Sequence, residues 1–206
     1  MFYVKIAAVL AVSYAIGCIC TGYYLTKLLT GKDIRQLNSK STGARNVRRV
    51  LRWKGFTGTL AGDFGKGAAV IAGAFALQMP DWVVILCAVS VTAGHIWPVQ
   101  LGFHGGRGVA TAIGALTVFD WRLVLGMLVI FAVVFALSRK YMLSGIIALL
   151  SLVVIAIWAG YDPAVFAGIV LLTFIILLAH RGHISNILSS NRTVATGKIQ
   201  EQSIQK

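Results

Sequence analysis

Acidic residues are scarce in this sequence: Asp and Glu together number 6 of 206 residues, against 19 Lys and Arg. Hard metal ions take oxygen ligands, largely carboxylates, so this composition offers few ligands for such a site. Cysteine is also sparse, and its three residues lie inside apolar stretches without a C-x-x-C pair: Cys18, Cys20 and Cys87. The sequence therefore predicts no disulfide framework, and we expect neither a metal nor a cofactor.

Three common catalytic motifs are missing as well. The chain has no G-x-S-x-G, no G-x-x-x-x-G-K-[ST] and no H-x-x-x-x-D. Their absence argues against a serine-hydrolase elbow, against a nucleotide-binding P-loop, and against the histidine–aspartate acyltransferases of the soluble or peripheral kind.

Apolar residues dominate what is present. They make up 58% of the chain, charged residues only 12%, and the mean hydropathy is +0.82, which is far more apolar than a soluble domain. The net charge of +13 does not require a nucleic-acid partner, because the cytoplasmic loops of membrane proteins collect Lys and Arg. Membrane lipid is the expected surrounding, with no nucleic acid bound.

Seven apolar stretches are candidates for transmembrane helices, which need roughly 17–25 residues to cross. They run approximately over Tyr3–Leu25, Phe56–Leu77, Val83–Leu101, Val109–Phe119, Leu123–Leu137, Leu143–Ala159 and Ala164–Ala179. The fourth and fifth are short and are separated only by the polar triplet Asp120-Trp121-Arg122, so the fourth is expected to begin earlier or to be partly re-entrant. We expect an all-α, polytopic membrane protein with about seven helices. It forms a single domain over residues 1–206, with a short flexible tail from about residue 189.

Charge alternates between successive connections. Nine basic residues lie between Lys27 and Lys54, and further bases follow in every second connection and in the tail. The alternate connections hold the acids Asp81, Asp120 and Asp162, with Arg122 as their only base. Because positive loops stay in the cytoplasm, this pattern predicts an N-terminus outside and a C-terminus in the cytoplasm.

Polar residues that an ordinary positive loop does not need gather on the predicted cytoplasmic side. The first such loop mixes hydroxyl, amide, glycine and guanidinium groups, and we expect it to bind an anion: Ser39, Gly43, Arg45, Asn46 and Arg49. Asp63 and Lys66 lie three residues apart on one helix face, where they can pair; such intramembrane charges are functional candidates, although a plain interfacial pair is the alternative.

A glycine-rich connection follows the third stretch, with Gly105, Gly106, Arg107 and Gly108. Glycines leave backbone N–H groups unshielded and arginine adds a forked donor, so this loop suits a phosphate or an acyl phosphate. His95 and His180 border the same side and are candidates for proton transfer, with an interfacial role as the alternative. A basic site beside hydrocarbon suits a substrate that carries phosphate at one end and a lipid chain at the other.

The order of these motifs resembles the PlsY family, the membrane-embedded acyl-phosphate:glycerol-3-phosphate acyltransferases of bacteria. Gly94-His95-x-x-Pro98 through Gly105-Gly106-Arg107-Gly108-Val109-Ala110-Thr111 resembles the family's G-H-x-F-P … G-G-K-G-V-A-T. Asp63-x-x-Lys66-Gly67 resembles its D-x-x-K-G, and His180-Arg181 matches the start of its H-R-E-N. The family's G-S-G-N-x-G-A-T-N-V-x-R loop is matched at Ser39, Gly43, Ala44, Asn46, Val47 and Arg49.

This resemblance implies an enzyme of the bacterial inner membrane that moves a fatty acyl group from acyl phosphate to glycerol 3-phosphate on the cytoplasmic side, forming lysophosphatidate. On this reading the catalytic residues are His95, Arg107 and His180. The substrate-binding residues are Ser39, Gly43, Arg45, Asn46, Arg49, Asp63, Lys66, Gly105, Gly106 and Gly108. Backbone N–H groups around Gly43, Gly105 and Gly106 are expected to cradle a phosphate. We favour electrostatic clamping of two anions, with the leaving phosphate taking the proton, over a dedicated side-chain base.

Departures from the family pattern leave alternatives open. Arg107 stands where the family has Lys, and further departures lie at Lys40, Ser41, Arg45, Leu143 and His183. They motivate a divergent member that acylates another acceptor. A small anion transporter is a third reading, which requires polar or broken helices near the bilayer midplane.

Overall fold

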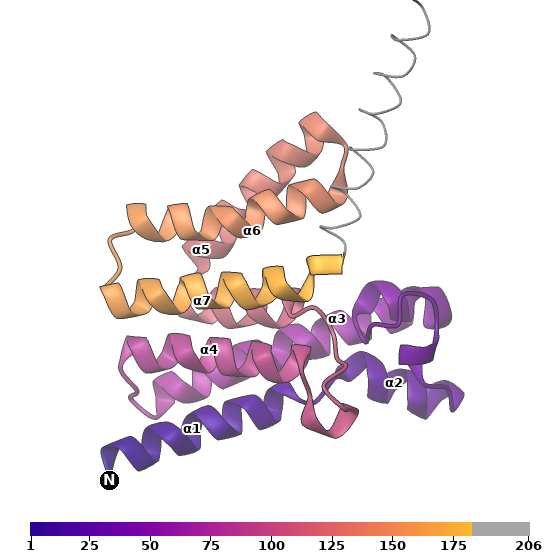
Figure 1. Cartoon of the computed structure of the whole chain (residues 1–206), viewed down its shortest axis with the longest axis horizontal. Helices are drawn as coiled ribbons and strands as arrows, with labels where there is room; N and C mark the ends of the chain where they lie inside the picture. The colour runs from indigo at the N-terminus through magenta and orange to yellow at the C-terminus, as the bar shows by residue number, and fades with distance from the viewer. Residues whose placement is uncertain (183–206) are drawn as a thin grey trace, which may run out of the picture.

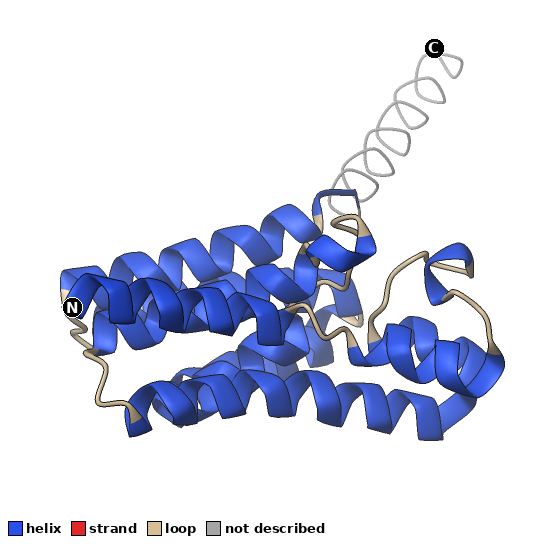
Figure 2. Ribbon diagram, turned by 90° about the horizontal axis from the view of Figure 1, so that it is seen from below, coloured by secondary structure: helices blue, strands red, loops and turns tan. Residues whose placement is uncertain are grey.

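The computed structural model describes residues 1–182, so the tail expected from about residue 189 and the departure at His183 lie outside the described residues. Regular structure in this part of the chain is entirely helical (Figure 2), which confirms the all-α class. The α-helices are α1 (Phe2–Gly17), α2 (Thr21–Thr30), α3 (Ala44–Ala76), α4 (Asp81–Ile96), α5 (Val109–Ser138), α6 (Tyr141–Trp158) and α7 (Pro163–Ala179). Two short 3-10 turns, η1 (Ile34–Gln36) and η2 (Val99–Leu101), lie in the connections.

Four helical segments are long and apolar enough to cross a membrane: Phe2–Thr30, Asp81–Leu101, Val109–Ser138 and Tyr141–Trp158. Helix α7 is also apolar but shorter, at 17 residues. Helix α3 carries too many charges in its first turns to read as one apolar span, although its second part contains the predicted stretch from Phe56. Length and composition alone therefore support several crossings.

The helices lie side by side and run between two ends of the molecule (Figure 1). One end holds the connections 31–43, 97–108 and 139–140, and we call it the basic end. The opposite end holds the connections 77–80 and 159–162. Helix α4 lies at the centre and packs against α1, α3, α5 and α7. Most of its apolar residues are buried because protein surrounds it on several sides, whereas most of α5 faces outward.

Close backbone contact holds α1 against α4. A Cβ on Gly94 would overlap Tyr14 O, and a Cβ on Gly17 would overlap Val91 O. Lipid tails are as apolar as the helices, so helices in a membrane gain stability from such close packing of small residues. The contact also lets the Tyr14 hydroxyl donate to Trp97 O, at 2.7 Å. Trp97 is the residue that follows α4.

The predicted first span, Tyr3–Leu25, is not one helix. The chain leaves α1 at Gly17, and Cys20 is extended before α2 begins at Thr21. The carbonyl groups released by this break are paired by side chains from elsewhere. Gln100 Nε2 donates to Cys18 O at 2.6 Å, and Lys66 Nζ donates to the carbonyls on either side of it. The break is stable in an apolar stretch because these donors satisfy it.

The predicted polar break between the fourth and fifth stretches is confirmed. Asp120 departs from helical backbone inside α5, and its carboxylate accepts from Arg122 Nε at 2.9 Å and from the Tyr161 hydroxyl. Tyr161 follows the far end of α6, while Tyr141 begins that helix at the basic end. The half of α5 after Asp120 therefore returns towards the basic end beside α6 (Figure 1).

Helix α3 also bends. Arg52 lies in the left-handed region at φ 56°, which separates a basic segment that starts at Ala44 from the apolar part of the helix. Such a conformation costs a non-glycine residue about 1–3 kcal/mol. The bend lets the basic segment turn along the basic end while the remainder continues through the bundle.

Candidate functional site

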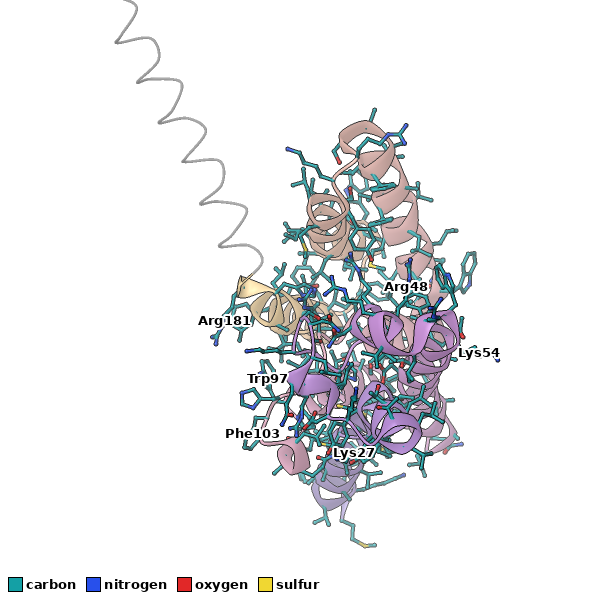
Figure 3. The ribbon with its side chains drawn as sticks, turned by 90° about the vertical axis from the view of Figure 1, so that its right-hand side faces the viewer. Lys27, Arg48, Lys54, Trp97, Phe103 and Arg181 are labelled. Atoms are coloured by element: carbon teal, nitrogen blue, oxygen red, sulfur yellow. The ribbon has the colours of Figure 1, made fainter. Side chains whose placement is uncertain are left out.

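The candidate site lies at the basic end, where segments far apart in the sequence meet. Figure 3 looks onto this end, with Lys27, Arg48, Lys54 and Arg181 spread over it. The first connection is tied to the glycine-rich one, because Thr42 N donates to Gly105 O at 3.3 Å. Arg35 adds a second tie by donating from Nη1 to Leu101 O at 2.7 Å.

The glycine-rich connection folds back onto the end of α4. Gly105 N donates to Ile96 O at 3.1 Å, and Gly106 N donates to His95 O at 3.0 Å. These bonds satisfy carbonyl groups that the helix end would otherwise leave unpaired. Gly108, at φ 82°, then forms the N-cap of α5, a backbone conformation that favours glycine.

This geometry corrects one sequence-based expectation. The N–H groups of Gly105 and Gly106 were expected to cradle a phosphate, but both are used to hold the loop against α4. The N–H of Gly43, a third expected donor, lies 3.3 Å from Ser41 Oγ and donates to it. Spacing cannot reveal this, because the acceptor carbonyls belong to a helix that ends nine residues earlier. The first turn of α5, whose N–H groups have no intrahelical acceptors, is the better backbone candidate for an anion.

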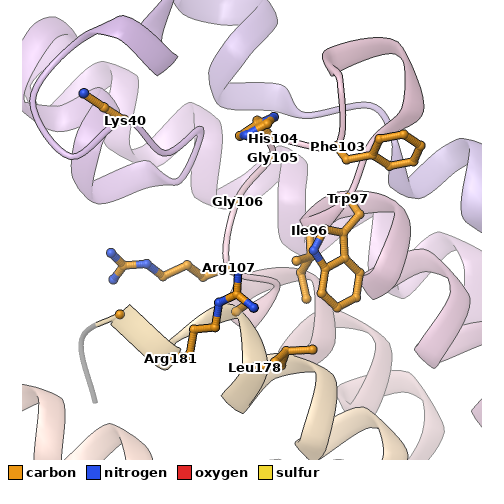
Figure 4. A pocket seen from close by; sticks show the side chains of 12 residues that line it. Lys40, Ile96, Trp97, Phe103, His104, Gly105, Gly106, Arg107, Leu178 and Arg181 are labelled. Atoms are coloured by element: carbon orange, nitrogen blue, oxygen red, sulfur yellow. The ribbon is translucent and has the colours of Figure 1, made fainter. Parts of the chain in front are cut away.

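A pocket of about 390 Å³ opens beside this loop (Figure 4). Its lining is Lys40, Ile96, Trp97, Phe103, His104, Gly105, Gly106, Arg107, Leu178, Ala179, Arg181 and Gly182. Three of these residues are cations from three different segments: Lys40, Arg107 and Arg181. In Figure 4 Arg181 points from the end of α7 towards the Gly106–Arg107 segment. Other lining residues are apolar, so the pocket places cationic side chains beside apolar ones.

Arg107 is the most enclosed cation of the pocket. Burial, and after it the positive charge of Arg45, lower the pKa of its guanidinium below the usual value. An arginine remains charged at physiological pH, so an anion that enters here relieves repulsion between two cations. Arg45 itself lies over the Tyr141 ring, 4.5 Å from its centroid, which holds it near the start of α6.

Asp63, Lys66 and His95 form a buried cluster behind the glycine loop. Lys66 Nζ lies 2.8 Å from His95 Nδ1 and 3.3 Å from Asp63 Oδ1, and only 8% of the Lys66 side chain is exposed. The sequence-based pairing of Asp63 with Lys66 is confirmed. The expected contact of Lys66 with a phosphate is not supported, because its ammonium donors are used by Gly17 O, Ile19 O and His95.

Asn46 organises the first connection. Its Nδ2 lies within 3.2 Å of the carbonyl oxygens of Ile34, Leu37 and Ser41, which share its two N–H donors, and its Oδ1 accepts from Ser39 N at 3.2 Å. The amide is buried, with 3% of the residue exposed. This network gives Asn46 a role in shaping the loop, and its predicted contact with substrate stays a prediction.

The remaining sequence-based candidates lie around the pocket. Ser39 and Arg49 are exposed on the basic end, and Gly43 is the N-cap of α3. His180 is half-buried after the last turn of α7, with Nδ1 2.8 Å from Ile176 O. Their predicted substrate contacts stay predictions.

Two pocket cations were missed from the sequence: Lys40, noted only as a departure, and Arg181, noted only as part of a motif. Their signal was present as positive charge beside the other motifs, but only the fold shows that they face the same pocket. Within residues 1–182 no three His, Cys, Asp or Glu side chains are grouped so as to hold a metal ion.

Comparison with known proteins shows one family throughout. A sequence profile described as glycerol-3-phosphate acyltransferase matches residues 7–190. Glycerol-3-phosphate acyltransferase 1 of Desulfitobacterium hafniense (strain Y51) is 41% identical over 179 residues, which cover 87% of this chain and 89% of the relative. The glycerol-3-phosphate acyltransferase of Synechococcus sp. (strain CC9902) is 37% identical, with 87% of this chain and 90% of the relative covered.

Solved structures agree with these sequence matches. The crystal structure of PlsY (YgiH), an integral membrane glycerol 3-phosphate acyltransferase, superposes in its glycerol 3-phosphate form with a TM-score of 0.82. The identity is 29%, and 90% of this chain and 93% of that chain are covered. Its lysophosphatidic acid form superposes with a TM-score of 0.80 at 28% identity, with 90% of this chain and 93% of that chain covered.

Proposed function

Since this chain belongs to the PlsY family of integral membrane glycerol-3-phosphate acyltransferases, which form lysophosphatidate, we propose that acyl phosphate is its acyl donor and that the pocket beside Arg107 holds the reacting groups. The observation that carries this proposal is the composition of the pocket. Three cations meet an apolar wall, as a substrate with a phosphate head and a hydrocarbon chain requires. Ile96, Trp97 and Leu178 line the apolar part.

The reaction needs no covalent enzyme intermediate. An acyl phosphate is a mixed anhydride, so the 1-hydroxyl of glycerol 3-phosphate can attack the acyl carbon directly. The new ester C–O bond forms as the bond from the acyl carbon to the phosphate oxygen breaks, and the hydroxyl proton leaves with the inorganic phosphate. The protein must bring two anions together and stabilise the charge that develops on the acyl and phosphate oxygens.

The cations of the pocket are placed for this work. Arg107 binds the phosphate closest to the glycine loop, and Arg181 and Lys40 approach from the end of α7 and from the first connection. Arg45 lies near Arg107 and packs over the ring of Tyr141, and its positive charge can bind the second phosphate. Arginine binds phosphate through a planar fork, so Arg107 can replace the family's lysine as a phosphate ligand.

The membrane orientation follows from the same distribution of charge. We infer seven crossings, made by α1, the second part of α3, α4, the two halves of α5, α6 and α7. The basic end, with the pocket, faces the cytoplasm of a bacterial cell, because Lys and Arg accumulate there while Asp81, Asp120 and Asp162 lie at the other end. Both substrates then reach the site from the cytoplasmic side.

The donor is tested by purifying the protein in detergent and supplying glycerol 3-phosphate with either palmitoyl phosphate or palmitoyl-CoA. Equal amounts of inorganic phosphate and lysophosphatidate from palmitoyl phosphate, and no product from palmitoyl-CoA, are expected. Lysophosphatidate from palmitoyl-CoA alone contradicts the proposed donor. Phosphate release without lysophosphatidate contradicts the proposed acceptor and supports the alternative of a different acceptor.

A further inference from the structure

Lys66 fills the gap that the break between α1 and α2 leaves in the bundle. Its ammonium donates to Gly17 O at 2.8 Å and to Ile19 O at 2.7 Å, and it lies 2.8 Å from His95 Nδ1. An ammonium has three N–H donors, and these three acceptors use all of them. Asp63 Oδ1, at 3.3 Å, balances the buried charge and also accepts from Thr21 N at 3.4 Å.

This contact determines which nitrogen of His95 carries the ring proton. Nδ1 has two polar neighbours: Lys66 Nζ, which can only donate, at 2.8 Å, and Asp63 Oδ1, which can only accept, at 3.5 Å. Because the lysine is closer, we assign Nδ1 as the acceptor and place the hydrogen of the neutral ring on Nε2. The ring is enclosed, with 3% of the residue exposed. His95 is therefore fixed in one tautomer and one orientation by a side chain that lies 29 positions earlier in the chain.

The other side of His95 supports the glycine loop. His95 O accepts from Gly106 N at 3.0 Å, and the Nε2 edge of the ring lies where a Cβ on residue 106 would be. Cys20 Sγ, from the α1–α2 break, lies 3.6 Å from the same carbonyl. The α1–α2 break therefore contacts His95, and His95 contacts Gly106 of the glycine loop. Arg107 follows Gly106 directly in the sequence.

We propose that Lys66 and His95 are positioning residues, which hold the Gly105–Gly106 segment from behind and so place Arg107 in the pocket. This rests on the proposed function, in which Arg107 binds phosphate. We expect neither side chain to touch the substrates, because three acceptors already use the donors of Lys66 and because neither Lys66 nor His95 lines the pocket. The sequence-based assignment of His95 to proton transfer is thereby replaced by a role in preorganisation.

The first test reads the tautomer and needs no turnover. The protein is labelled with ¹⁵N-histidine in detergent, and the resonances of His95 are assigned by their loss in His95→Asn. A single tautomer with the proton on Nε2 is expected, and it should give way to a mixture in Lys66→Met. A proton on Nδ1, or a tautomer population that is unchanged in Lys66→Met, overturns the proposal even if the enzyme is active. An enzyme inactive with palmitoyl phosphate contradicts the proposed function but leaves this measurement intact.

The second test compares two lysines that both donate to backbone carbonyls. Lys5 Nζ lies 3.0 Å from Leu77 O at the opposite end of the bundle, so Lys5→Met is a matched control for Lys66→Met. Because a displaced Arg107 weakens the binding of phosphate before the reaction begins, Lys66→Met should raise the KM for the substrate whose phosphate Arg107 binds, either glycerol 3-phosphate or palmitoyl phosphate, by about 10-fold or more and change kcat less. Lys5→Met should leave both constants unchanged. Equal effects of the two variants, or a fall in kcat alone for Lys66→Met, contradict a positioning role.

The third test separates positioning from acid–base catalysis at His95 and remains informative if Lys66→Met does not fold. Asparagine at position 95 offers an amide oxygen near the place of Nδ1 and can still accept from Lys66, whereas leucine cannot. His95→Asn should keep kcat/KM within about 10-fold of the unmodified enzyme, and His95→Leu should lose about 100-fold, as for a misplaced catalytic group. A catalytic base at Nε2 instead predicts that both variants lose activity equally, and that result overturns the proposal.

Discussion

The ring of His95 occupies the space that a side chain on residue 106 would need, so the contact between His95 and Gly106 requires a residue without a Cβ. Gly106 N also donates to His95 O, which locks the two residues together on both backbone and ring. The glycine at this position is explained by the packing of its own loop.

Gly106→Ala should therefore reduce activity without unfolding the protein. The added methyl overlaps the His95 ring, so the loop shifts and Arg107 leaves its place. We expect kcat/KM to fall by about 100-fold, as for displacement of a binding group by about 1 Å. Gly73→Ala is the matched control, because a Cβ there meets nothing within 4 Å. The steady-state assay with both substrates checks the pair, and unchanged activity in Gly106→Ala contradicts the packing argument.

Asn46→Ala should loosen the first connection. It removes two N–H donors that three carbonyls share and the oxygen that accepts from Ser39 N, and the carbonyls left unpaired cost about 1–3 kcal/mol. Limited proteolysis in detergent should show faster cleavage between residues 32 and 43. Steady-state kinetics should show a raised KM for glycerol 3-phosphate. Gln36→Ala, which removes an exposed amide from the same connection, should be cleaved as slowly as the unmodified protein. Equal cleavage of the two variants would argue against this role.

Tyr141 should act through its ring. Tyr141→Phe keeps the face beneath Arg45 and is expected to retain full activity. Tyr141→Leu removes a cation–π contact of about 0.5–1 kcal/mol, so kcat/KM should fall by roughly 2- to 5-fold. Similar losses in the phenylalanine and leucine variants would show that the hydroxyl, rather than the ring, matters.

Membrane orientation can be tested with single cysteines, since Cys18, Cys20 and Cys87 are buried. Gln36 and Ala159 are both exposed, the first at the basic end and the second at the opposite end. A membrane-impermeant maleimide should label Ala159→Cys on intact cells, but should label Gln36→Cys only after the membrane is opened. The reverse pattern would place the pocket outside the cell.

Some features of the fold can be predicted from residues that are close together in the sequence. The polar triplet at Asp120 interrupts an apolar run, and a membrane tolerates such residues only at its edges or in protein contacts, so the break in α5 was predictable. The break at Cys18–Cys20 was not, because it lies in an apolar stretch and is stabilised by Lys66 and Gln100 from distant segments. The bend at Arg52 likewise carries no local signal such as proline.

The site was predictable in its elements more than in its arrangement. The motif around Arg107 and the pairing of Asp63 with Lys66 could be read from spacing. That Arg181 and Lys40 face the pocket, and that the N–H groups of Gly105 and Gly106 are turned towards α4, depends on contacts between helices.

The central claim is that Arg107 binds phosphate in this pocket, and the most direct measurement is the activity of Arg107→Ala beside Arg107→Lys and Arg122→Ala. Arg122 is an exposed arginine at the opposite end, paired with Asp120 at 2.8 Å, and controls for the loss of one positive charge. We predict that Arg107→Ala lowers kcat/KM by about 100-fold or more, as for loss of a group that stabilises developing charge, while its melting temperature in detergent stays unchanged. Arg107→Lys should retain most activity, and Arg122→Ala all of it. Activity close to that of the unmodified enzyme in a folded Arg107→Ala would contradict the account.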